Sequence, residues 1–283
     1  MALHLAALGL VPLATQTGLC SAGDLERIAP EVLSEYEARG NALRELEAVT
    51  PPGDRDCLRF SRFEHSYGRQ GLLVSPRLGF VAYDSGCCGD WMLDLGTARW
   101  QGEELELVPR FAPRSEPWER LACRLVLVPW GERQYLLGLD ELDRFVNDIN
   151  LGIFRERGGW AWHTEDGSCS PLVGHPELPA ELATRLLNDP VVGLVLASTR
   201  IEDIDAHGRW QCTFDLTLDV GARAGLWVGM QLELVEDHSA FERAEVTSVA
   251  PERAHAAVRC LGAERHATPA PGWHASSRAR SPW

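Results

Sequence analysis

Short apolar runs separated by turn-forming residues constrain the fold of this chain more than any other feature of its sequence. Between residues 57 and 163 these runs are bounded by Gly, Pro, Asp and Ser, a pattern typical of β-strands joined by tight turns. A second series of the same kind spans residues 191–260. The sequence therefore predicts a mainly β chain of α+β type, with two β units and a few flanking helices.

The first series predicts an antiparallel β-meander. Residues 124–128 and 133–137 flank a Pro-Trp-Gly-Glu sequence. They predict a β-hairpin, because Pro and Gly supply the backbone angles of a tight turn. The other runs are short and apolar, and the strands expected from this series are residues 72–74, 80–83, 105–107, 121–128 and 135–137.

Three segments predict helices. Residues 24–49 carry apolar side chains near the 3.6-residue period and stop at a Pro-Pro-Gly sequence. After the hairpin, Asp140 is placed to cap a helix and Gly152 to end it. The apolar stripe of that helix consists of Leu142, Phe145, Val146 and Ile149. A shorter helix is expected near residues 180–187.

The second series predicts a small β-barrel or sandwich. Apolar and polar side chains alternate clearly along residues 210–219, as in a strand with one buried face. The five expected strands are residues 191–199, 210–219, 230–235, 244–249 and 255–260.

These patterns define the expected domain layout. The tail after Gly262 is rich in Ala, Pro, Ser and Arg, a composition that predicts disorder. The expected parts are a signal or buried apolar segment at 1–22, a helix-flanked meander domain at 24–165, a linker with a short helix at 166–189, a barrel domain at 190–262 and a disordered tail at 263–283.

The charge of the chain excludes several classes of function. The net charge is −14, with 41 acidic and 27 basic residues, all of them arginine. Binding to nucleic acid requires a positive surface, so no nucleic-acid partner is expected. The absence of lysine excludes a P-loop, a Schiff-base lysine and a Ser/Lys dyad, and no cofactor or metal is expected.

The N-terminal segment leaves two interpretations open. From Ala2 to Leu19 the only ionisable side chain is His4, which favours a cleaved export signal ending near Cys20-Ser21-Ala22. A buried apolar element is the other interpretation. Pro12 interrupts the apolar run, which falls short of the ~20 residues of a membrane span. We expect a periplasmic or secreted protein without an integral membrane segment, the alternative being a cytoplasmic one.

Two stretches resemble known β-domains of bacteria. The sequence from Phe80 through Gly96-Thr97-Ala98-Arg99-Trp100 to Leu107 resembles the calycin-like or lipocalin-like meanders of bacterial envelope proteins. With Trp130-Gly131 and the Asp140 helix, residues 57–165 resemble a bacterial β-rich family to which no activity is attached. The resemblance implies a meander fold and points to no known activity.

The second unit resembles the glycine-punctuated β-domains of bacterial envelope scaffold proteins. The residues that carry this resemblance are Asp219-Val220-Gly221, Ala224-Gly225-Leu226, Val228-Gly229-Met230 and Val246-Thr247-Ser248-Val249. Each glycine suits a turn, so the resemblance implies structure and no chemistry.

Cysteines supply the candidate reactive groups. Cys87 and Cys88 are adjacent and form a candidate redox or metal pair, but neighbouring cysteines bridge each other only with strain. The preferred interpretation buries one thiol and leaves the other free or paired with a distant cysteine such as Cys57 or Cys123. If export permits it, Cys212 and Cys260 form a candidate disulfide, because the parity of their neighbours directs both into the second core.

Other polar motifs favour turns over catalytic or metal sites. Residues 203–208 resemble the start of a calcium loop, but Phe214 stands where the essential carboxylate belongs. Residues 166–170 with His175 hold a nucleophile and a base in a Pro-rich linker of unspecified geometry. Single histidines occur at His65, His163, His238 and His255.

The tryptophans indicate either a ligand cavity or core packing. If the meander closes, the side chains that would face its interior include Trp91, Trp100, Trp130, Trp160 and Trp162. We expect a non-enzymatic, envelope-associated binding or interaction protein whose partner is another protein or a small apolar ligand. The alternatives are a cysteine- or metal-dependent hydrolase centred on Cys87 and Cys88, and an immunity or adaptor protein that binds a basic partner.

Overall fold

The computed structural model describes most of the chain from residue 58 to residue 278. The described residues are 41, 58–65, 68–75, 79–86, 89–110, 122–154, 158–164, 172, 174–204, 210–236, 239–261 and 269–278. The expected segment at 1–22 lies outside this set, as does the helix at 24–49 apart from Asn41. The chain divides into two compact units, and residues 140–158 belong to the second although they interrupt the first.

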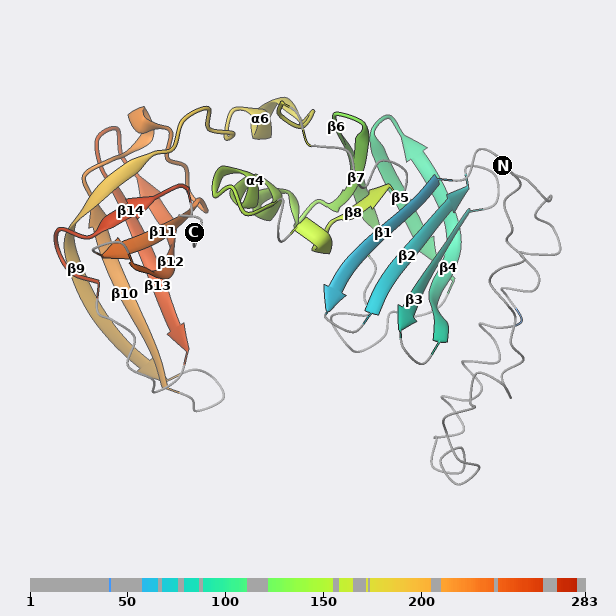
Figure 1. Ribbon diagram of the computed structural model, residues 1–283, viewed down its shortest axis with the longest axis horizontal. Helices are drawn as coiled ribbons and strands as arrows, with labels where there is room; N and C mark the ends of the chain where they lie inside the picture. The colour runs from blue at the N-terminus through green and yellow to red at the C-terminus, as the bar shows by residue number, and fades with distance from the viewer. Residues whose placement is uncertain are drawn as a thin grey trace, which may run out of the picture. The chain divides into compact units, whose positions relative to one another are not determined.

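The first unit is a closed barrel of eight antiparallel strands (Figure 1). Each strand pairs with the next one in the chain, and the last pairs with the first, so the predicted meander is closed by contact between β1 and β8. The strands are β1 (Leu58–His65), β2 (Gly68–Ser75), β3 (Gly79–Gly86), β4 (Gly89–Gln101), β5 (Glu104–Pro109), β6 (Arg124–Trp130), β7 (Arg133–Gly138) and β8 (Trp162–Thr164).

Alternate side chains of these strands fill the barrel. Leu105 and Leu107 of β5 are buried, whereas Val108, of the opposite parity, is 53% exposed. This alternation is the one expected of a strand with one face on a core. The buried core cluster consists of Phe60, Leu72, Val74, Phe80, Ala82, Leu105, Leu107, Leu125, Leu136 and Trp162.

The predicted hairpin is confirmed. Strands β6 and β7 pair from Leu125 opposite Gly138 to Trp130 opposite Arg133. Gly131 in the turn has φ of +62°, a conformation that glycine adopts without steric cost. Strands β1 and β4 had no counterpart among the expected elements, because charged and glycine residues interrupt their apolar patterns, and β8 had none because its three residues are too few to show a pattern.

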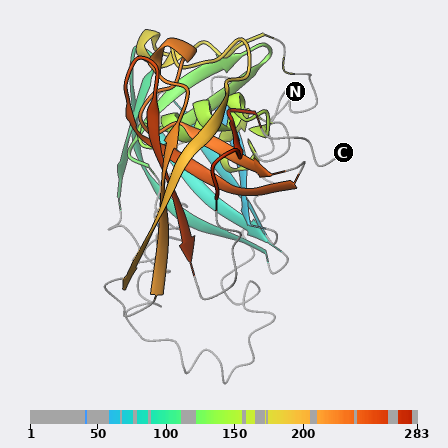
Figure 2. The same cartoon turned by 90° about the vertical axis from the view of Figure 1, so that its left-hand side faces the viewer.

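The second unit is a closed barrel of six antiparallel strands, which decides between the predicted barrel and sandwich (Figure 2). The strand order is β10-β13-β12-β11-β14-β9, with β9 pairing with β10 to close it. The strands are β9 (Val192–Ile204), β10 (Trp210–Leu218), β11 (Gln231–Glu236), β12 (Ser239–Val249), β13 (Ala254–Leu261) and β14 (His274–Ser276). All five expected strands are present.

The prediction of a disordered tail is wrong for residues 269–278. Strand β14 pairs with both β9 and β11, and without it the barrel would remain open between them. Trp273 is 6% exposed and Ala275 1% exposed, so this segment contributes to the core. Composition suggested disorder because three residues are too few to produce a strand pattern, whereas pairing on both sides stabilises them.

Helices are few. The longest among the described residues is α4 (Leu142–Asn150), and the others are α6 (Ala180–Ala183) and the 3₁₀ turns η3 (Gly158–Trp160) and η4 (Ala222–Ala224). None of the helices in the described part of the chain has the length and apolar character needed to cross a membrane.

Helix α4 forms as predicted, but its cap and its unit differ from expectation. Its N-cap residue is Glu141 and not Asp140, and no side chain caps the first turn. Leu142, Phe145 and Val146 are buried, and Gly152 follows the helix with φ of +75°. The meander domain expected at 24–165 included this helix, whereas the structure places it in the second unit.

Two asparagines attach α4 to the second unit. Asn147 donates from Nδ2 to the Gly229 carbonyl at 3.0 Å and accepts the Gln231 amide hydrogen at 2.8 Å. Asn150 makes the same pair of bonds, donating to the Arg185 carbonyl and accepting from the Leu187 amide, both at 3.0 Å. Each amide side chain thus satisfies one backbone acceptor and one backbone donor, which explains why this helix belongs to the second unit.

Replacement of Asn147 by alanine is expected to lower the stability of the second unit by about 2 kcal/mol, because it leaves buried polar groups without their partners. Asn147 is 6% exposed. Asp143→Asn is the control on the same helix. It weakens an ion pair with Arg185 whose side chains are 60% and 35% exposed, and such pairs contribute little. Urea unfolding measures both changes, and equal effects would contradict a specific role for Asn147.

Candidate functional site

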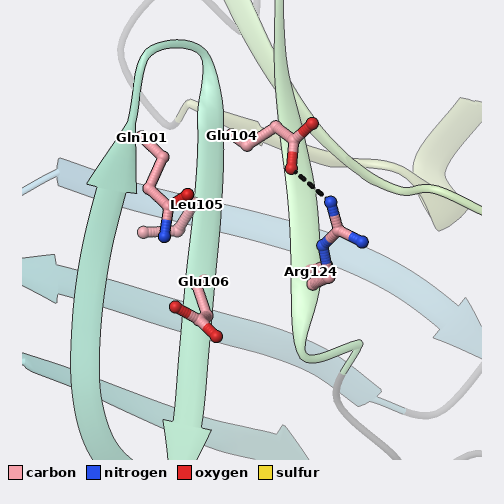
Figure 3. A pocket seen from close by; sticks show the side chains of 5 residues that line it. All are labelled: Gln101, Glu104, Leu105, Glu106 and Arg124. Atoms are coloured by element: carbon pink, nitrogen blue, oxygen red, sulfur yellow. Dashed lines mark hydrogen bonds and ion pairs between the residues drawn. The ribbon is translucent and has the colours of Figure 1, made fainter.

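A polar pocket lies on the outer face of the first barrel, where strands β4, β5 and β6 run side by side. Its volume is about 290 Å³, and it is lined by Gln101, Glu104, Leu105, Glu106 and Arg124 (Figure 3). Leu105 is fully buried, and its apolar side chain belongs to the barrel core. Glu104 and Glu106, of the opposite parity, carry their carboxylates on the outside of the barrel.

Strand pairing brings these charges together from separate parts of the chain. Glu106 is the register partner of Arg124 on β6, and Glu104 lies two residues from Glu106 on the same face. The Arg124 guanidinium bonds to the Glu104 carboxylate at 2.6 Å, with side-chain exposures of 60% and 46%. Figure 3 shows this pair reaching across from one strand to the next. The pair is a solvent-exposed surface feature.

The electrostatics of the pocket follow from this arrangement. The hydrogen bond that Arg124 donates to Glu104 raises the pKa of Arg124 above its usual value, and the negative charges of Glu104 and Glu106 act in the same direction. The charged groups that line the pocket are therefore two carboxylates and one guanidinium. Arg99 of β4 is the other register partner of Glu106, and Glu103 adds an exposed carboxylate at the β4–β5 turn. The surface in and around the pocket therefore carries a small excess of negative charge.

The pocket can bind, and its described lining holds no hydroxyl, thiol or imidazole group. It contains carboxylates, one amide and one guanidinium, and none of the Ser, Cys or His side chains that attack a substrate. Within the described part of the chain, no three His, Cys, Asp or Glu side chains are grouped to hold a metal ion. The chemistry visible at this site is ion pairing and hydrogen bonding.

A second polar feature lies inside the first barrel. Arg62 and Gln70 are register partners on β1 and β2, they are 6% and 5% exposed, and the Arg62 Nε donates to the Gln70 Oε1 at 2.7 Å. The guanidinium carbon lies 4.4 Å from the centre of a Trp162 ring. Burying a charge is costly, and these two contacts offset part of that cost.

The structure describes some of the cysteines that were singled out in the sequence and not others. Cys87 and Cys88 lie outside the described residues, between the end of β3 at Gly86 and the start of β4 at Gly89. The hydrolase hypothesis centred on them therefore stays a prediction. Cys212 has a free thiol, and its register partner on β13 is Cys260.

The other polar motifs do not converge on one site. Residues 205–208 and 165–170 lie outside the described residues, and β9 and β10 on either side of residues 205–209 pair as antiparallel neighbours. His163 lies half-buried in β8, where its Nδ1 is 3.2 Å from the Ala161 carbonyl oxygen. His175 and His255 are exposed.

The tryptophans that the structure describes pack in several places. Trp162 is 1% exposed and belongs to the core of the first barrel, and Trp100 packs against that core while half-buried. Trp130 is 7% exposed and donates from Nε1 to the Gly174 carbonyl at 3.0 Å. Trp160 is also buried. Core packing therefore accounts for Trp162 and Trp100.

Sequence reasoning missed the pocket residues. The alternation of Glu104, Leu105, Glu106 and Leu107 was a sufficient signal for an outward carboxylate pair. The position of Arg124 beside them depends on a pairing between β5 and β6, which are separated by residues 110–123. No protein-family model, curated protein or solved structure matches this chain.

Proposed function

We propose that this protein is a non-enzymatic binding protein, and that the outer face of β4, β5 and β6 in the first barrel contacts a basic segment of a partner protein. The observation that carries the proposal is the pocket in which Glu104 and Glu106 flank Arg124. A guanidinium or ammonium group of the partner can compete with Arg124 for these carboxylates. The net charge of −14 supports the same choice, because it attracts basic partners over longer distances.

The lining of the pocket supports a charged partner over a small apolar ligand. Four of its five residues are polar or charged, and the fifth, Leu105, is fully buried. The ion pair between Glu104 and Arg124 is exposed and is therefore inexpensive to rearrange. A pocket of this kind suits exchange of ion-pair partners during binding.

The test uses a fluorescent synthetic peptide of alternating Arg and Ser, with its affinity measured for the full-length protein and three variants. Glu106→Gln is expected to weaken binding roughly fivefold, because it removes a carboxylate that the peptide uses. Arg124→Gln is expected to strengthen binding by a similar factor, since it removes the internal competitor for Glu104. Raising the salt concentration should weaken binding by the wild type.

The matched control is Glu245→Gln on β12 of the second barrel, which removes one exposed carboxylate that does not line the pocket. Its effect on peptide affinity is expected to be negligible. Opposite effects of the two pocket variants, with none at residue 245, would support the proposed site. Equal weakening by Glu106→Gln and Glu245→Gln would show that bulk charge alone attracts the peptide, and the proposal would fail.

A further inference from the structure

The second barrel brings two cysteines into direct cross-strand register. Cys212 of β10 lies opposite Cys260 of β13, next to the last pair of the ladder, Gln211 and Leu261. The ladder runs without a register shift to Leu218 opposite Ala254. Two cysteines separated by 47 residues of sequence are thus neighbours in the barrel wall.

Cys212 and Cys260 have the same parity on their strands as the residues of this ladder that point into the barrel core. The pairs of the same parity are Phe214 with Val258, Leu216 with Ala256, and Leu218 with Ala254, and all six of these residues are at most 2% exposed. Cys212 itself packs against this core and is half-buried. Directly opposed residues of an antiparallel pair share one face of the sheet, so the register gives Cys260 a position of the same parity.

The spacing of paired strands matches that of a disulfide. Directly opposed residues in antiparallel strands have Cα atoms about 4.5 or 5.5 Å apart, and disulfides span Cα separations of about 4.4–6.8 Å. On its other side, Cys212 is paired with Glu202 of β9, which offers no thiol. The half-buried position of Cys212 near the end of its strand leaves it within reach of a small oxidant.

We propose that Cys212 and Cys260 form a reversible disulfide across β10 and β13 that locks the second barrel, and that the free thiol of Cys212 represents the reduced state. With oxidised glutathione as oxidant, the Cys212 thiolate attacks one glutathione sulfur and releases the other glutathione as a thiol. The Cys260 thiolate then attacks the Cys212 sulfur of this mixed disulfide and releases the second glutathione thiol. Two cysteine thiols are oxidised and one glutathione disulfide is reduced.

The bond would restrain most of the second barrel. The chain between the two cysteines contains β11 and β12, as well as parts of β10 and β13. Closing a loop of this length lowers the entropy of the unfolded chain. The unfolding temperature of the second unit is expected to rise by roughly 5–15 °C on oxidation.

The lysine-free sequence makes this pairing simple to map. Trypsin cleaves after Lys and Arg, so in this chain it produces one peptide of residues 210–223 with Cys212 and another of residues 260–265 with Cys260. The full-length protein is incubated with oxidised glutathione, the remaining thiols are alkylated, and the protein is digested without reduction. Mass spectrometry is expected to find these two peptides joined, and calorimetry to find the rise in unfolding temperature.

Two serine variants complete the test. Cys212→Ser should abolish both the joined peptide and the rise in unfolding temperature, whereas Cys123→Ser, which alters an exposed cysteine outside the second barrel, should change neither. Mapping of the wild type decides the question even if a variant fails to fold. Recovery of both peptides with alkylated thiols, as glutathione adducts, or with Cys212 joined to another cysteine would overturn the proposal.

Discussion

Replacement of Gly79 by alanine is expected to destabilise the first barrel by about 3 kcal/mol. Gly79 begins β3 with φ of +98°, a backbone conformation that L side chains rarely adopt. A Cβ atom at this position would also overlap the carbonyl oxygen of Gly96 on β4, which is backbone and cannot turn aside. Strain and overlap therefore act together. Urea unfolding, monitored by hydrogen exchange in peptides from each barrel, measures the two units separately.

Gly102→Ala is the control for this experiment. Gly102 lies in the turn between β4 and β5, also with positive φ (+65°), but no heavy atom lies within 4 Å of the position that a Cβ atom would take there. Alanine at this position carries the cost of a positive φ but overlaps no neighbouring atom. The free energy of unfolding is therefore expected to fall by about 1 kcal/mol. Similar losses at the two positions would contradict the close approach of β3 to β4 at Gly96.

Replacement of Trp162 by alanine is expected to cost the first barrel about 4 kcal/mol, the largest effect among these variants. Trp162 is 1% exposed on β8, the strand that closes the barrel against β1. The substitution leaves a large cavity and also removes the ring that lies against the buried Arg62 guanidinium. Both losses occur where β8 pairs with β1 to close the barrel, so hydrogen exchange is expected to increase in these two strands.

Trp100→Ala is the matched control in the same barrel. Trp100 packs against the same core but is half-buried, and its truncation is expected to cost about 2 kcal/mol. If Trp162 instead lines an unfilled ligand cavity, its replacement would cost no more than that of Trp100. Urea unfolding of the two variants compares these interpretations.

The elements that were predicted from the sequence are those with strong local signals. The hairpin of β6 and β7 was recognised because Pro129 and Gly131 mark the turn between two apolar runs. Helix α4 was recognised from its apolar stripe, and β10 from its regular alternation. In each case the residues that decide the structure lie within about ten positions of one another.

The candidate sites required contacts that local patterns do not contain. Glu104 and Glu106 could be assigned to an outer face from their alternation, but the partner Arg124 comes from a strand that follows residues 110–123. The docking of α4 depends on Asn147 reaching the backbone of Gly229 and Gln231, more than 80 residues away. Neither contact has a sequence period that could reveal it.

The sequence by itself determined that this is a mainly β chain with two β units, because alternation and turn residues act over short distances. The tertiary structure decided that both units close into barrels, since closure depends on β8 and β14, two strands of three residues each. Such segments are too short to show a pattern and are stabilised by pairing on both sides. The same long-range pairing assembled the charged pocket and placed Cys212 opposite Cys260.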